Sequence, residues 1–197
     1  MKRLPLILAV GLAMGLFAAS SIATQGETVI RIDVENRGSI HIKLHRKEAP
    51  KTTAHILGLV RSGFYDGQRF FRVLKSPRPY LVQTGDPLSR DLSKLDDPKM
   101  GTGGSGAKVP FEDSGFPNEE GAVGLSTPPK ERDNGDSQFY MLLGSARFLD
   151  GNYTVFGKVI AGMDVLKKIE RGDKITSVRV QTGGEEANVF VQALRRR

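Results

Sequence analysis

Apolar and polar residues alternate along most of the chain that follows the first 27 residues. The alternation is clearest at 28–32 and 40–44, on either side of an Arg37-Gly38 pair suited to a hairpin turn. Further short apolar runs follow at 70–74, 80–83, 123–125, 138–142, 155–159 and 175–181. A period of two places apolar side chains on one face of a strand, so the pattern predicts a mainly β chain, either a barrel or a sandwich.

Two segments have helical spacing instead. Ala49 and Pro50 precede apolar residues at helical intervals over 54–60, and Gly63 supplies a stop signal. A shorter helix is predicted at 163–169. Residues 87–106 are polar and rich in Gly, Asp and Lys, which predicts a long loop. Without an internal repeat or a linker, the pattern favours a single domain.

The first 23 residues differ from the rest. Lys2 and Arg3 precede an apolar run at 4–19, and small residues follow up to Ala23. This is the arrangement of a secretory signal, and the run is shorter than the roughly 20 residues of a membrane-spanning helix. We therefore expect a signal peptide at 1–23 and a domain at 24–197, periplasmic or otherwise exported, with no stable membrane insertion after cleavage. A retained anchor is the alternative.

Composition narrows the chemistry further. The chain has no cysteine, which excludes disulfides, thiol catalysis and cysteine-ligated metals. Its formal net charge of +7 is dispersed except at 195–197, and the basic residues are not interleaved with aromatic ones as in a nucleic-acid surface. We expect no nucleic-acid partner, although binding to anionic lipid or nucleic acid stays open as an alternative.

Two suggestive spacings have more ordinary interpretations. Residues 101–106 fit G-x-G-x-x-G, but neither a preceding strand nor a following helix is predicted, so a tight glycine loop is favoured over a phosphate site. His41 and His45 flank Lys43 on the solvated face of a predicted strand, without further ligands nearby. No G-x-S-x-G elbow is present for serine hydrolysis. We expect neither a metal nor a cofactor.

Several ordered motifs carry a more specific pattern, namely Phe70-Phe71-Arg72-Val73, residues 80–86, 137–140 and 148–159. Over about 28–181 the chain resembles the cyclophilins, which are peptidyl-prolyl cis-trans isomerases. The resemblance implies a closed eight-stranded antiparallel β-barrel capped by two α-helices. It also implies catalysis of rotation about X-Pro bonds in unfolded or partly folded polypeptides, here after export.

The resemblance also implies roles for single residues. Arg72 matches the catalytic arginine of the family, and Gln83 matches the residue that helps to position it. The apolar pocket for the proline ring would be formed by Tyr80, Leu81, Tyr140, Leu149 and Tyr153. A guanidinium keeps its charge and can donate to the proline nitrogen, whose lone pair is localised when the amide is twisted.

The chain departs from the family pattern at several of these positions. The family usually has histidine at Phe71, phenylalanine at Tyr80 and Tyr140, glycine at Thr84 and tryptophan at Phe148. Buried phenolic hydroxyls need hydrogen-bond partners. An alignment without gaps places Pro128 and Pro129 where the family has a small residue and a peptide-pairing asparagine. Because Pro129 has no N–H, we expect weaker substrate binding there.

The leading hypothesis is thus a monomeric isomerase whose partners are proline-containing polypeptides. The alternative is a catalytically weak module that binds proline-containing segments as a chaperone or scaffold, which the altered aromatic residues and Pro129 motivate.

Overall fold

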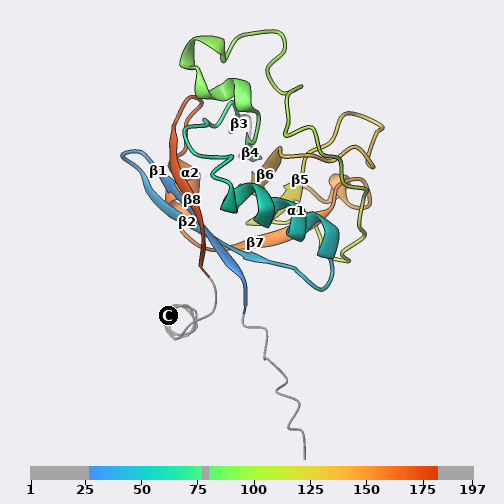
Figure 1. Cartoon of the computed structure of the whole chain (residues 1–197). Coiled ribbons are helices and arrows are strands. Elements are labelled where there is room, and N and C mark those ends of the chain that lie inside the picture. Colours follow the sequence, from blue (N-terminus) through green and yellow to red (C-terminus); the bar gives the residue numbers. More distant parts are fainter. Residues whose placement is uncertain (1–26, 77–79, 182–197) are drawn as a thin grey trace, which may run out of the picture.

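The computed structural model describes residues 27–76 and 80–181. Within these ranges the chain forms strands, α-helices and short 3-10 turns (Figure 1). In chain order they are β1 (Val29–Val34), β2 (Gly38–Leu44), α1 (Pro50–Arg61), β3 (Arg72–Leu74), β4 (Leu81–Thr84), η1 (Pro87–Arg90), η2 (Leu92–Lys94), β5 (Ala122–Leu125), β6 (Phe139–Leu142), η3 (Arg147–Leu149), β7 (Val155–Ala161), α2 (Met163–Lys168) and β8 (Ile175–Gln181).

The strands form one antiparallel sheet of eight in the order β3-β4-β6-β5-β7-β2-β1-β8. The sequence prediction of a mainly β fold with eight antiparallel strands is confirmed. Among the described residues, β3 and β8 stand at opposite ends of this order and share no ladder that would close a barrel. The sheet is a curled half-barrel instead of the closed barrel that we expected.

The short length of β3 explains the open edge. Its three residues pair with β4, and the chain just before it turns toward the start of β8. There Arg69 and Lys174 form an isolated bridge, and Phe70 N–H donates to the Asp173 carbonyl over 3.1 Å. A few backbone bonds therefore join the two edges without a continuous strand pair.

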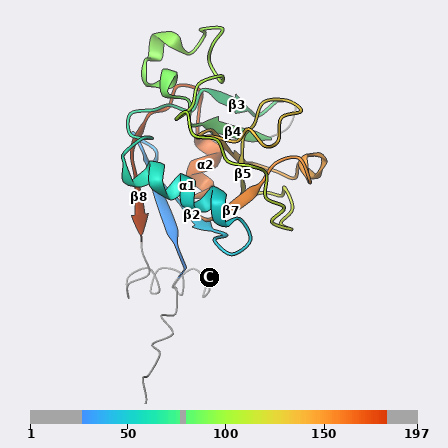
Figure 2. The ribbon, with the colours of Figure 1, turned by 45° about the vertical axis from the view of Figure 1, so that its right-hand side comes forward.

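The predicted hairpin and the predicted helices are present. In β1 and β2, Ile30 pairs with Ile42 and Ile32 pairs with Ile40, and all four side chains are buried. Pro50 begins α1, and the helix buries its 56–60 face in the core. α1 packs against β8 and α2 packs against β2 (Figure 2).

The long polar stretch 87–106 is more ordered than a plain loop. It contains η1 and η2, and it extends beyond the sheet beside β3 in Figure 1. Asp86 and Asp91 begin the two turns, because their carboxylates accept the N–H groups of Leu88 and Ser93. Such local caps occupy backbone groups without apolar periodicity, so the hydrophobic pattern could not indicate the turns.

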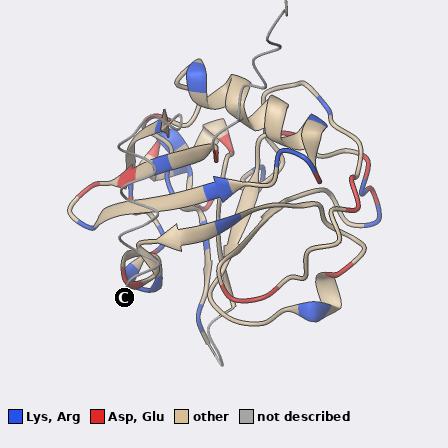
Figure 3. Cartoon of the chain, turned by 90° about the horizontal axis from the view of Figure 1, so that it is seen from below, with Lys and Arg blue, Asp and Glu red and all other residues tan. Residues whose placement is uncertain are grey.

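Basic and acidic residues are interspersed over the strands and loops (Figure 3). Many of them form ion pairs, such as Arg37 with Asp173 and Arg179 with Asp66. Among the described residues, no helix is both long enough and apolar enough to cross a membrane.

Candidate active site

Four neighbouring strands bring one row of residues together. Arg72 on β3 pairs in register with Gln83 on β4, Gln83 pairs with Tyr140 on β6, and Tyr140 pairs with Gly124 on β5. Residues in register across a sheet point to the same face. The ladder therefore places the guanidinium, the amide and the phenol side by side, although they lie far apart in the sequence.

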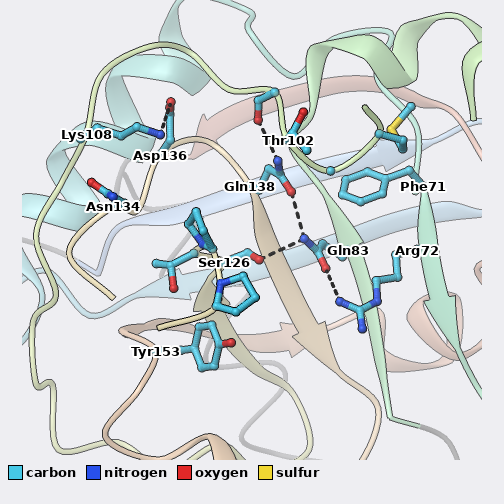
Figure 4. Close-up of a pocket in the computed structure, with 16 residues that line it drawn as sticks. Phe71, Arg72, Gln83, Thr102, Lys108, Ser126, Asn134, Asp136, Gln138 and Tyr153 are labelled. Carbon is cyan, nitrogen blue, oxygen red and sulfur yellow. Dashed lines mark hydrogen bonds and ion pairs between the residues drawn. The ribbon is translucent and has the colours of Figure 1, made fainter. Parts of the chain in front are cut away.

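A chain of hydrogen bonds extends this row to the glycine loop, residues 101–106 (Figure 4). Arg72 Nη1 lies 3.5 Å from Gln83 Oε1, and Gln83 Nε2 donates to Gln138 Oε1 and to Ser126 Oγ, each over 3.0 Å. Gln138 Nε2 in turn donates to the Gly103 carbonyl over 2.7 Å. The donors and acceptors of Gln83 and Gln138 are thus used in a fixed direction, which orients the oxygen of Gln83 toward Arg72.

Two buried carboxylates hold the glycine loop. Asp86 accepts the N–H groups of Gly101 and Gly103, and Asp136 accepts those of Ser105 and Gly106. A methyl group at Gly103 would lie 2.5 Å from Asp86 Oδ1, so the close approach requires glycine. Because carboxylates of the protein already occupy these N–H groups, the loop is not arranged to cradle a phosphate.

A cavity of about 450 Å³, called the first cavity here, lies over this hydrogen-bond chain. Five residues singled out from the sequence line it, namely Arg72, Gln83, Pro128, Pro129 and Tyr153. Leu149 lines an adjoining second cavity of about 370 Å³, together with Pro128, Pro129 and Tyr153. Both cavities share the ridge of residues 127–129.

The predicted aromatic and leucine residues form a partly buried group. Tyr80, Leu81, Tyr140, Leu149 and Tyr153 belong to one apolar group, called the tyrosine cluster here. Leu81 and Tyr140 are only 4% and 3% exposed, and they line neither cavity. The structure thus brings the expected pocket residues together in one cluster, of which Leu81 and Tyr140 form the buried part. The substrate-binding role of these residues stays a prediction.

The hydroxyl of Tyr140 has a buried partner that the sequence did not reveal. Tyr140 Oη donates to Asn118 Oδ1 over 2.6 Å, and Asn118 is fully buried. Burial raises the pKa of the Tyr140 phenol, so the group remains a neutral donor. The ring lies close over Gly124, where a methyl group would come within 2.1 Å of Cζ. Gly124 therefore provides the space for Tyr140.

Asn118 also holds the turn that carries Leu149. Its backbone N–H and its Nδ2 both donate to Asp150 Oδ1, over 2.8 and 3.0 Å, and its carbonyl accepts the N–H of Ala146. Asp150 Oδ2 accepts from Arg147 Nε over 2.6 Å. The backbone hydrogen bond from Asn118 and the Arg147 contact lower the pKa of Asp150. Asn118 thus connects Tyr140 of the tyrosine cluster with the turn that carries Leu149.

Comparison with known proteins decides the family. The model of the family described as "Cyclophilin type peptidyl-prolyl cis-trans isomerase/CLD" matches residues 29–187. The chain belongs to this family. The family and the enzyme class, peptidyl-prolyl cis-trans isomerase, are therefore those that the motifs indicated.

Bacterial relatives match over most of their own length. A probable peptidyl-prolyl cis-trans isomerase of Brucella suis biovar 1 (strain 1330) is 33% identical over 186 residues, which cover 93% of this chain and 92% of the relative. Peptidyl-prolyl cis-trans isomerase B of Bacillus subtilis (strain 168) is 34% identical over 148 residues, 75% of this chain and 94% of the relative.

A solved cyclophilin supports the fold. The crystal structure of the Cryptosporidium parvum cyclophilin-type isomerase in the presence of the dipeptide Ala-Pro is similar with a TM-score of 0.64. The match covers 79% of this chain and 99% of that chain at 23% identity.

In the present chain, the end of β5 changes the interpretation of Pro128 and Pro129. Ser126 N–H donates to the Gln138 carbonyl over 2.8 Å, which continues the β5–β6 pairing by one residue. Thr127 follows directly and lines both cavities. Its backbone N–H and carbonyl pair with no other described residue. Pro128 and Pro129 come after it and are exposed. Thr127 is thus a further site residue that the alignment without gaps did not indicate.

Tyr80, the second unusual phenol, lies near the rim. It is partly exposed, and its ring centroid lies 5.6 Å from that of the exposed Phe148. Burial raises the pKa of Tyr80, and the nearby Arg72 charge acts in the opposite direction. The charge of Arg72 thus acts on the partly exposed phenol of Tyr80.

The two histidines of the sequence pattern, His41 and His45, contact different residues. His41 contacts Gln181, and the ring of His45 stacks on Phe116 with centroids 3.9 Å apart. In the described part of the chain, His, Asp and Glu side chains form no group of three that could hold a metal ion.

Proposed function

We propose that this cyclophilin accelerates X-Pro rotation in unfolded or partly folded polypeptides after export, with Arg72 as its catalytic residue. The observation that carries the proposal is the register row, which aligns Arg72, Gln83 and Tyr140 across three strands. It puts a cation beside the tyrosine cluster, where we place the proline ring.

The chemistry needs no bond cleavage. An X-Pro amide rotates slowly because twisting it removes resonance, with a barrier of about 18–20 kcal/mol. In the twisted state the lone pair is localised on the proline nitrogen, where an N–H donor stabilises it more than in the planar states. Arg72 supplies that donor, and Gln83 limits its freedom. The tyrosine cluster holds the ring while the preceding carbonyl turns.

We assign the pairing with the peptide backbone to Thr127 instead of Pro129. Thr127 retains an N–H and follows the last residue bonded to β6, so a substrate strand can extend the ladder from it. This assignment removes the reason for expecting weak binding at Pro129. A Pro129→Ala substitution should leave peptide affinity nearly unchanged, whereas Thr127→Pro should lower it.

Export remains part of the proposal. Residues 1–23 lie outside the described residues, and the support for a signal peptide is their sequence alone: basic residues, an apolar run and small residues before position 24. Mass determination of the protein recovered from the periplasm should show an N-terminus near Thr24. Recovery of the full-length chain in the membrane fraction would contradict cleavage.

Proline-limited refolding of a test protein distinguishes catalysis from binding. Arg72→Ala should lower kcat/KM about 100-fold or more, the usual effect of removing a preorganised donor to a transition state. The matched control is Arg61→Ala, since Arg61 is exposed at the end of α1 and lines neither cavity. Binding of the test protein without acceleration would favour the chaperone alternative, and acceleration that survives Arg72→Ala would contradict the mechanism.

A further inference from the structure

The second cavity adjoins the first cavity on the other side of residues 127–129. It shares Thr127, Pro128, Pro129 and Tyr153 with the first cavity, and it adds Leu149 from the tyrosine cluster. A polypeptide whose proline ring rests on that cluster therefore has neighbouring residues within reach of the second cavity. This step rests on the proposed function.

The walls of the second cavity combine an apolar surface with charge of one sign. Pro128, Pro129 and Phe148 form part of its apolar surface, and Phe148 is 64% exposed. Its charged lining residues are Lys130 and Arg132, and none of its lining residues is acidic. The first cavity differs, because its lining includes Asp136 beside Lys108, with 3.7 Å between the charged atoms.

Arg132 is exposed, and its described contacts are with uncharged groups. Its guanidinium lies over the Phe111 ring, 4.6 Å from the centroid, and Nη1 lies 3.4 Å from the Gly151 carbonyl. Neither partner carries a negative charge. Lys130 is exposed and has a φ of 66°, which places its backbone in the left-handed region at the turn.

Among the described residues, no carboxylate forms an ion pair with Lys130 or Arg132. Glu131 accepts from Asn134 Nδ2, Asp133 accepts the N–H of Phe111, and Asp150 binds Asn118 and Arg147. A carboxylate from outside would therefore meet two cations without displacing an ion pair of the protein. Attraction of this kind at a partly exposed site is modest and is weakened by salt.

We propose that the second cavity binds an acidic side chain of the substrate polypeptide, close in sequence to the proline that occupies the tyrosine cluster. Lys130 and Arg132 are then specificity-determining residues. The cavity favours Glu or Asp beside the proline and disfavours Lys or Arg, while the apolar surface accommodates the stem of the side chain.

The test uses the full chain and short peptides with one X-Pro bond. Each peptide carries Glu, Gln or Lys at one of the two positions on either side of the X-Pro pair. At low ionic strength the Glu peptide should exceed the Lys peptide in kcat/KM by about threefold to tenfold at one or more positions. The ratio should fall toward 1 as salt is added.

The combined variant Lys130→Gln and Arg132→Gln should move the Glu-to-Lys ratio of kcat/KM toward 1, by lowering kcat/KM for the Glu peptide and raising it for the Lys peptide. The control variant Arg61→Gln with Lys168→Gln removes two exposed charges at residues that do not line the cavity, and it should keep the wild-type ratio. A ratio that is equal in the wild type and the cavity variant would overturn this inference alone. No turnover of any peptide, Gln peptides included, would instead contradict the proposed function.

Discussion

Different interactions hold the two sides of the candidate site, the arginine side at Arg72 and the tyrosine side at Tyr140. On the arginine side, Arg72 is exposed, and the bonds that orient it run through Gln83 and Gln138 to the backbone of the glycine loop. On the tyrosine side, the phenol of Tyr140 is buried and bonded to Asn118, which is itself fully buried. One network ends in a cavity, and the other lies inside the fold.

The difference indicates what each network contributes. Groups that face a cavity can exchange a lost partner for water, so their loss costs little folding free energy and mainly affects orientation. A buried group that loses its partner retains its desolvation cost. We therefore expect the tyrosine side to determine stability and the arginine side to determine rate.

The largest effect on stability should come from Asn118→Ala. The substitution leaves the Tyr140 hydroxyl without an acceptor and removes the Nδ2 donor to Asp150. The free energy of unfolding should fall by about 1–3 kcal/mol, measured by urea denaturation. KM should also rise, because the turn that carries Leu149 loses the side-chain hydrogen bond from residue 118 to Asp150.

A double-mutant cycle with Tyr140→Phe isolates the hydrogen bond. Phenylalanine removes the hydroxyl that Asn118→Ala leaves unpaired, so the double variant should be more stable than the sum of the single effects predicts. Strict additivity would show that the bond between Tyr140 and Asn118 does not support the cluster.

Gln138→Ala should have the opposite profile. It removes one acceptor from Gln83 Nε2, which keeps its bond to Ser126, and water from the first cavity can reach the Gly103 carbonyl. We expect kcat to fall about threefold to tenfold, while the urea midpoint changes little. A large loss of stability with unchanged kcat would break the contrast between the two sides.

The smallest effect is a dependence on acid pH. The folded pKa of Asp150 is lowered from its ordinary 3.8, chiefly by the backbone N–H of Asn118. A lowered folded pKa contributes stability above the unfolded pKa, and this contribution is lost as the pH falls through the folded value. Asp150→Asn should therefore be less stable than the wild type near neutral pH.

The gap between the two proteins should narrow below about pH 3.8. Thermal unfolding of both proteins across the acid range gives the measurement. Parallel curves with a constant gap would show that the charge on Asp150 does not stabilise the turn.

Much of the fold followed from local pattern. Alternation placed the strands of the β1–β2 hairpin, and Pro50 with Gly63 bracketed α1, because periodicity and backbone restrictions act over a few residues. The motif around Arg72 and Gln83 indicated the family. Short turns such as η3 lack periodicity, and the sequence did not indicate them.

The sequence by itself determined which residue types occupy the strands and which charged group stands in the row, since both depend on short-range pattern and ordered motifs. Only the tertiary structure decided that Asn118 is the partner of Tyr140, that the β5–β6 pairing ends at Ser126, just before Thr127, and that β3 and β8 share no ladder among the described residues. Each of these depends on contacts between segments distant along the chain. Such contacts are fixed by sheet register and side-chain packing, which no single stretch of sequence contains.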